Sequence, residues 1–318
     1  MLIPKKTDNE DYRLDALRHL AILDSPAEER FDRITRISKS IFNVPISLVS
    51  LIDENRQWFK SCCGLSIFET SRDISFCAHT ILGDSLFIVE DAVLDTRFAD
   101  NPLVTGEPYI RFYAGYPLEI AGGFKLGTLC IIDHKPRFFN EQQYALLIDL
   151  AALIKSELET IQLALLDELT GITNRRGFII LADKILQSSY RNKNEAILLF
   201  LDLNKFKEIN DTLGHNIGDD ALKQMALLLP KIFRNADLFA RLGGDEFVVL
   251  LPGTDAANLQ KIKSKLELEL EKYNSNSNKP YNLSCSVGFS VYEPSTPPDL
   301  DKLLHDADIN MYHCKNRK

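Results

Sequence analysis

The fold is decided by the stretch Arg241-Leu-Gly-Gly-Asp-Glu-Phe247, which the apolar run Val248 to Leu251 follows directly. Together with the apolar residues 238–242, it predicts two strands joined by a tight hairpin, because glycine takes a positive φ without steric cost. The turn also holds two carboxylates, Asp245 and Glu246, where the backbone carries least bulk. Acidic oxygens in such a turn can approach a metal-bound phosphate. A solvated acidic turn would have the same residues, so the surrounding sequence has to decide.

A further carboxylate ends the apolar strand predicted over residues 196–202. Buried strands of α/β sheets deliver metal ligands at their carboxyl ends in this way. If this strand neighbours the hairpin, Asp202 and Asp245 face each other. Two carboxylates and one main-chain oxygen suit Mg²⁺ that carries a triphosphate.

The rest of residues 167–318 predicts a sheet that contains antiparallel strands, with helices on one face. Periodicities of three to four residues indicate helices, and short apolar runs indicate strands. Besides the hairpin, the predicted elements are a helix from near 175, the strand 196–202, helices around 222–233 and 259–270, a strand over 283–291 and a helix over 300–315.

Length and composition favour a soluble protein of two domains. The chain has 318 residues, of which 45% are hydrophobic and 26% charged,. Its net charge of −8 argues against non-specific nucleic-acid binding, which needs a basic surface,. We expect no membrane association, because the N-terminus lacks the apolar core of a signal peptide and no apolar run approaches about 20 residues. Six cysteines without framework spacing indicate reduced thiols and a cytoplasmic location,.

Residues 1–138 predict an α+β sensor-like domain. Two amphipathic helices, around 9–23 and 26–41, precede several strands,. A strand over 45–52 pairs with residues 56–61, and further strands are predicted over 86–89, 112–118 and 126–132.

A continuous helix without proline or glycine is predicted over 139–166, between the two domains. Its apolar residues fall at steps of three and four, close to a coiled-coil seam. We expect a parallel dimer helix, because a stripe that links two domains has no single core to cover; the alternative is a helix packed on its own domain. The stripe consists of Leu147, Leu150, Ile154, Leu158, Ile161 and Leu165.

Four segments of the first domain resemble the GAF domains of bacterial signalling proteins: Ser50–Lys60, Ser75–His79, Asp95–Pro102 and Phe112–Pro117. The resemblance implies a six-stranded sheet with helices on one face and a ligand cavity on the other. GAF ligands are diverse, so the ligand of this domain stays unknown.

Several side chains of this domain could line the cavity or bind a ligand there. Cys77 and His79 invite a metal or haem proposal, and Cys77 alone could attach a bilin. A zinc site needs about four ligands, so we expect both residues to pack around the cavity. Aromatic and basic residues that could line a pocket, or simply belong to the core, are Trp58, Phe59, Arg111 and Tyr113.

Residues 167–318 resemble the GGDEF domain of diguanylate cyclases, with five separated motifs in the family's order. The resemblance implies a palm-like fold related to nucleotidyl cyclases. It also implies the condensation of two GTP into cyclic di-GMP with release of pyrophosphate, with two Mg²⁺ or Mn²⁺ ions per active site.

The resemblance also implies residue roles. Asp202, Asp245 and the Leu203 carbonyl would bind the metal; Asp245 is also the candidate base, and Glu246 supports the site. Guanine would be held by the side chains of Asn210 and Asp219, in the loop that contains His215. Phosphate charge would be neutralised by Lys207 and Lys315.

The spacing of Arg234 and Asp237 to the hairpin resembles that of the family's inhibitory product site. Arginine can donate two parallel hydrogen bonds to the O6 and N7 atoms of guanine. An Arg-x-x-Asp alone is usually a surface salt bridge, but at this offset we expect product feedback inhibition.

Two positions depart from the family pattern. Asn204 stands where many relatives have a second aspartate, which is tolerable if that side chain is not a ligand. A cation expected four residues past Lys315 is absent, so we expect the triphosphate to be held by Lys315, Arg317 or Lys318.

Because each such domain holds one GTP, the reaction implies a homodimer, whose arrangement a GAF ligand or an upstream sensor protein would bias. Two other functions stay open: a catalytically weak receptor that binds cyclic di-GMP at Arg234 and Asp237, and a cyclase that acts on a single purine nucleotide.

Overall fold

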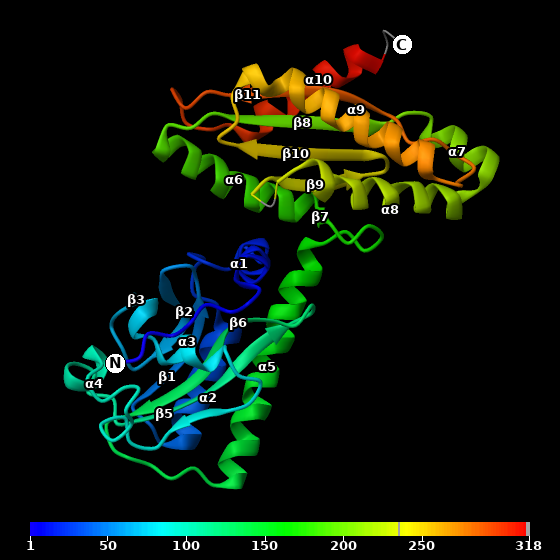
Figure 1. Cartoon of the computed structure of the whole chain (residues 1–318). Helices are drawn as coiled ribbons and strands as arrows, with labels where there is room; N and C mark the ends of the chain where they lie inside the picture. The colour runs from blue at the N-terminus through cyan, green and yellow to red at the C-terminus, as the bar shows by residue number, and fades with distance from the viewer. Residues whose placement is uncertain (235, 316–318) are drawn as a thin grey trace. The chain divides into compact units, whose positions relative to one another are not determined.

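The computed structural model describes residues 1–234 and 236–315 (Figure 1). The chain divides into two compact units, Met1–Gln162 and Leu163–Lys318. Within the described residues, no helix is both long and apolar enough to span a membrane.

The first unit is built on a six-stranded antiparallel sheet with the strand order β3-β2-β1-β6-β5-β4. The predicted pairing of the first two strands is confirmed, with a register shift at Val49 and Ser50. The strands are β1 (Ile46–Ile52), β2 (Arg56–Cys63), β3 (Glu69–Ser71), β4 (Phe87–Val89), β5 (Phe112–Ile120) and β6 (Phe124–Asp133).

The helices of the first unit divide between the two faces of this sheet. Three of them share one apolar core with the sheet: α1 (Glu10–His19), α2 (Glu29–Phe42) and α5 (Glu141–Leu165). The opposite face forms a second core with α3 (Phe76–Thr80) and with the segment that includes α4 (Pro102–Thr105). Trp58 belongs to the first core, whereas Phe59 and Tyr113 belong to the second.

The apolar stripe of the long helix packs on its own domain. Leu147, Leu150, Ile154 and Leu158 of α5 are buried in the first core, against the sheet and helices α1 and α2. Our expectation that this stripe is the seam of a parallel dimer is therefore wrong. The face of the sheet beside α5 supplies the apolar surface that the stripe needs.

The second unit has a five-stranded sheet with the order β11-β8-β10-β9-β7. The predicted hairpin is confirmed, and Gly244 takes a φ of +50° in its turn. The elements are α6 (Arg175–Asn192), α7 (Phe206–Leu213), α8 (His215–Ile232), α9 (Leu259–Asn276), α10 (Leu300–Lys315), β7 (Thr173–Asn174), β8 (Ala196–Leu203), β9 (Leu238–Gly243), β10 (Glu246–Pro252) and β11 (Cys285–Tyr292).

Helices cover both faces of this sheet, so the expectation of helices on one face is wrong. Leu199 and Leu201 of β8 share a core with α8 and α9. The neighbouring Phe200 pairs with Gly288, where an added Cβ would lie 2.1 Å from the Ala307 carbonyl of α10. Every position of β8 is buried, because alternate side chains point into two cores,.

Candidate active site

The strand register brings the predicted metal-binding carboxylates together. β8 and β10 are antiparallel neighbours in which Glu246 pairs with Asp202. The Leu203 N–H donates a hydrogen bond of 3.1 Å to the Asp245 carbonyl oxygen. Asp202 is only 8% exposed, and Asp245 and Glu246 are half-buried. The hairpin turn and the end of β8 therefore form one acidic edge.

The electrostatics of this edge favour the binding of cations. Burial and the negative charge of Asp202 raise the pKa of Asp245 above its ordinary value. Burial and the nearby Asp308 raise the pKa of Glu246. A cation relieves such repulsion, and Lys315 does so in part, because its Nζ lies 2.6 Å from Asp202 Oδ1,.

The oxygen donors at this edge suit a hard divalent cation. Asp202 and Asp245 offer two carboxylates beside main-chain oxygens, which is the ligand type that Mg²⁺ prefers. Within residues 1–234 and 236–315, no group of three or more His, Cys, Asp or Glu side chains is placed to hold a metal by itself. Ligands beyond the carboxylate pair would therefore come from the main chain, water or a phosphate.

Arg241 fixes the turn that carries Asp245, a role that the sequence analysis missed. Its Nε and Nη2 donate hydrogen bonds to the Gly244 carbonyl oxygen at 3.0 and 2.8 Å, and its Nη1 donates to Asp167 Oδ1 at 3.0 Å. Asp167 follows α5 and also accepts hydrogen bonds from the Thr170 N–H and hydroxyl. One guanidinium thus connects the start of the second unit to the residue before Asp245.

The predicted guanine-binding residues lie on the helical hairpin of α7 and α8. Asn210 and Asp219 are half-buried, whereas His215 and Lys207 are exposed. The Asn210 side chain lies directly over Gly218, since a Cβ added there would come within 1.9 Å of Asn210 Oδ1. The absence of a side chain at Gly218 therefore creates the space that the Asn210 amide occupies.

Asn204, which differs from the family pattern, is held by hydrogen bonds to residues at the start of β11. Its Oδ1 accepts a hydrogen bond of 2.7 Å from the Ser286 hydroxyl, and its N–H donates to the Ser284 carbonyl oxygen at 2.9 Å. Its side chain therefore has a structural role beside Leu203. Arg317 and Lys318, named above as candidate phosphate ligands, lie outside the described residues.

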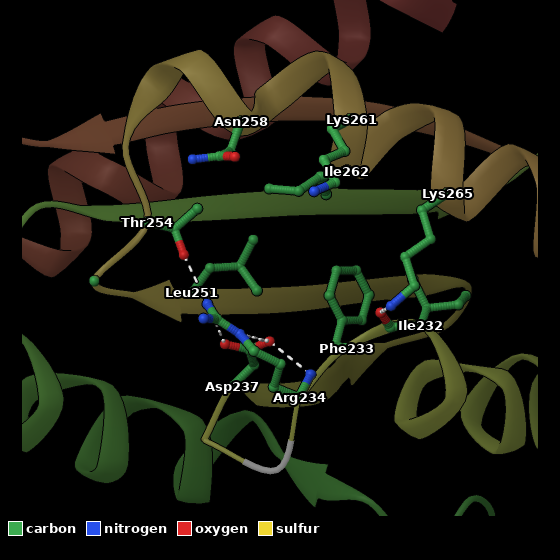
Figure 2. A pocket seen from close by; sticks show the side chains of 11 residues that line it. Ile232, Phe233, Arg234, Asp237, Leu251, Thr254, Asn258, Lys261, Ile262 and Lys265 are labelled. Atoms are coloured by element: carbon green, nitrogen blue, oxygen red, sulfur yellow. Dashed lines mark hydrogen bonds and ion pairs between the residues drawn. The ribbon is translucent and has the colours of Figure 1, made fainter.

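Arg234 and Asp237 form a hydrogen-bonded loop at the rim of a hollow of about 280 Å³ (Figure 2). The buried Asp237 accepts a hydrogen bond of 2.7 Å from the Arg234 N–H, and the Arg234 side chain, 63% exposed, reaches Thr254 Oγ1 at 2.8 Å. Lys261 and Lys265 of α9 line the same hollow. The hollow therefore combines apolar walls with several cationic groups.

Two family models match the chain. The GAF domain matches residues 26–158, and the model described as diguanylate cyclase, GGDEF domain, matches residues 164–318. The chain is therefore a GAF–GGDEF protein of α+β fold, as the two resemblances predicted.

Two of its relatives are named as enzymes of cyclic di-GMP metabolism. The chain is 29% identical over 266 residues to diguanylate cyclase DgcP of Escherichia coli, which covers 79% of this chain and 76% of DgcP. It is 44% identical over 177 residues to cyclic di-GMP phosphodiesterase PA2567 of Pseudomonas aeruginosa, which covers 55% of this chain. The chain spans only 30% of the length of PA2567.

Among solved structures, the isolated GGDEF domain of TpbB from Pseudomonas aeruginosa is similar to part of this chain. It is 34% identical, with a TM-score of 0.43, and the match covers 48% of this chain and 90% of that one.

Proposed function

We propose that the protein is a diguanylate cyclase, which condenses two GTP into cyclic di-GMP and releases two pyrophosphates. The observation that carries this proposal is the acidic edge formed by Asp202 at the end of β8 and Asp245 in the adjoining hairpin turn. The matches to the GGDEF family model and to DgcP support the same reaction.

Asp202, Asp245 and the Leu203 carbonyl would hold Mg²⁺ or Mn²⁺, two ions per active site. When bound, the ions supply positive charge against the triphosphate and the leaving pyrophosphate. Asp245 would accept the proton of the attacking 3′-hydroxyl, and Glu246 would support the metal site. Lys207 and Lys315 would neutralise phosphate charge. The ion pair of Lys315 with Asp202 already brings this ammonium group to the acidic edge.

Asn210 and Asp219 would select guanine. A carboxylate accepts hydrogen bonds from the ring N–H and the amino group of guanine, which adenine cannot donate in the same pattern. The position of both residues on the α7–α8 hairpin supports a shared base-binding role, with His215 exposed at the start of α8. We expect GTP to be used and ATP to be rejected.

The Arg234 and Asp237 loop would bind cyclic di-GMP and inhibit the enzyme. The exposed guanidinium of Arg234 at the rim of the hollow supports this role, because arginine forks the O6 and N7 atoms of guanine,. Since each GGDEF domain would hold one GTP, catalysis requires two chains. We therefore propose a homodimer whose activity responds to an unidentified ligand or sensor partner of the GAF domain.

The test is the incubation of the purified chain with GTP and Mg²⁺, followed by chromatography for cyclic di-GMP. We expect product from GTP, none from ATP and none from Asp245→Ala. A folded chain that binds Mg²⁺ and GTP but forms no product would refute the cyclase.

The second candidate function is a receptor for cyclic di-GMP without turnover, which the hollow beside Arg234 favours. In that case the chain would bind labelled cyclic di-GMP, Arg234→Ala would lose this binding, and GTP would remain unchanged. For the enzyme, Arg234→Ala should instead release turnover from inhibition by added product.

A further inference from the structure

Two cysteines that are far apart in the sequence meet in the second core of the first unit. Cys77 lies on α3 and Cys130 on β6, and their Sγ atoms are 3.6 Å apart. Both are almost fully buried, with 1% and 0% of their surface exposed. The sulfurs are thus in van der Waals contact.

The environment of Cys77 stabilises a thiolate. Gln57 Nε2 donates a hydrogen bond to Cys77 Sγ at 3.2 Å, and the Tyr113 hydroxyl donates at 3.3 Å. Burial disfavours the charged form, but the surrounding hydrogen bonds, above all that with Cys130, lower the pKa of Cys77 below its ordinary value. Burial raises the pKa of Cys130. The two thiols therefore differ: one is set up as a nucleophile and the other stays protonated.

A small hollow of about 30 Å³ reaches this thiol. Gln57, Cys77 and Tyr113 line it, and its other walls are mostly apolar. The Thr70 hydroxyl also lines it and has no hydrogen-bond partner among the described residues. A water molecule needs about 10–15 Å³ of such space, so the hollow accepts a molecule of the size of hydrogen peroxide and excludes glutathione.

We propose that Cys77 and Cys130 form a peroxide-reactive dithiol in the GAF domain, which a small hydroperoxide oxidises to a disulfide. The inference rests on the contact of the two sulfurs, the donors around Cys77 and the hollow beside it. It does not depend on the activity of the second unit.

The reaction balances as two steps. The Cys77 thiolate attacks one oxygen of the hydroperoxide, so that the O–O bond breaks, an S–O bond forms and the leaving alkoxide or hydroxide takes up a proton. The Cys130 sulfur then attacks the sulfenic sulfur of Cys77. An S–S bond forms, the S–O bond breaks, and the departing hydroxide leaves as water with the proton of Cys130. Two thiols are oxidised by two electrons, and the peroxide is reduced to an alcohol or water and one further water.

The test treats the full chain with hydrogen peroxide and then blocks the remaining thiols with an alkylating reagent after denaturation. Non-reducing peptide mapping should recover the Cys77 and Cys130 peptides as one linked pair, before the partly exposed Cys62, Cys63 and Cys314 are oxidised. Recovery of both peptides as alkylated thiols, while those three cysteines are oxidised, would overturn the proposal.

Variants separate the two roles. In Cys130→Ser we expect oxidation to stop at a sulfenic acid on Cys77, which dimedone added during denaturation would trap, and in Cys77→Ser we expect no label at either position. Tyr113→Phe removes one hydrogen-bond donor to the charged thiolate and should slow disulfide formation about tenfold,. Cys62→Ser is the matched control and should leave the linked pair unchanged. Equal rates with hydrogen peroxide and bulky cumene hydroperoxide would contradict entry through the hollow.

Discussion

The substitution Gly218→Ala tests the proposed guanine site without replacing any polar side chain. A Cβ at this position would lie 1.9 Å from Asn210 Oδ1 and 2.9 Å from Asn210 Cγ, so the amide must move. Because Asn210 is a flexible side chain and Gly218 is inside α8, the fold can accept the methyl group. Alanine should even favour the helix by up to about 1 kcal/mol.

The expected effect is a weaker affinity for GTP with an unchanged or higher melting temperature. Loss of the proposed hydrogen bond from Asn210 to guanine would cost about 1–1.5 kcal/mol. Since 1.4 kcal/mol is a factor of about ten, the Kd for GTP should rise roughly five- to tenfold. A gain of 1 kcal/mol in helix stability would raise Tm by about 2–4 °C in a unit of this size.

The assay is isothermal titration of GTP into the wild type, Gly218→Ala, Asn210→Ala and the double variant. If the methyl group acts only through Asn210, it should cost nothing further once Asn210 is alanine. The control is Lys223→Ala, an exposed residue of the same helix. An unchanged Kd in Gly218→Ala, or additive losses in the double variant, would refute the reasoning.

Three further outcomes are expected. Arg241→Lys should lower cyclic di-GMP formation about tenfold while GTP still binds, because an ammonium group cannot connect Gly244 and Asp167 as the planar guanidinium does,; full turnover would contradict this. Glu10→Gln should destabilise the first unit by about 3 kcal/mol in urea unfolding, because it breaks a buried ion pair with Arg13 and Arg72,. These contacts overcome the effect of burial and hold the pKa of Glu10 far below its usual value. The stabilisation is therefore complete above the ordinary Glu pKa of about 4.3 and is lost as the pH falls. The stabilities of the variant and the wild type should converge in acid, and a difference that stays constant with pH would count against the ion pair. Gly288→Ala should destabilise the second unit by about 1–3 kcal/mol, because its Cβ would meet the α10 backbone at 2.1 Å, and an unchanged urea midpoint would show that α10 can move away,.

Local sequence was sufficient for the hairpin and for the strand that ends in Asp202. The glycine pair has the backbone freedom that the turn requires, and the flanking short apolar runs are typical of strands. The seven consecutive register pairs between β8 and β10 then follow from antiparallel pairing. The carboxylates of the acidic edge could therefore be predicted from two short segments, whereas the pairing of β8 with β10 had to be assumed.

Other elements of the fold could not be predicted from local sequence patterns. The two-residue strand β7 is too short to show any periodicity, and α7 lies in a segment that reads as a loop. The unbroken apolar run Ala196 to Leu201 of β8 was a signal for two covered faces, since a strand with one solvent-exposed face alternates polar and apolar residues,. That signal was available in the sequence, and the expectation of helices on one face did not use it.

The sequence by itself determined where strands, helices and the acidic turn occur, because these depend on side-chain periodicity and on the φ values that glycine permits. Only the tertiary structure decided what each surface meets. The stripe of α5 packs against a sheet of its own domain, Arg241 reaches back to Asp167, and Cys77 meets Cys130 across 53 residues of chain. An apolar or polar side chain specifies the chemistry of its partner but not where that partner lies in the sequence. The partner is fixed only when the sheets and helices pack together around their cores.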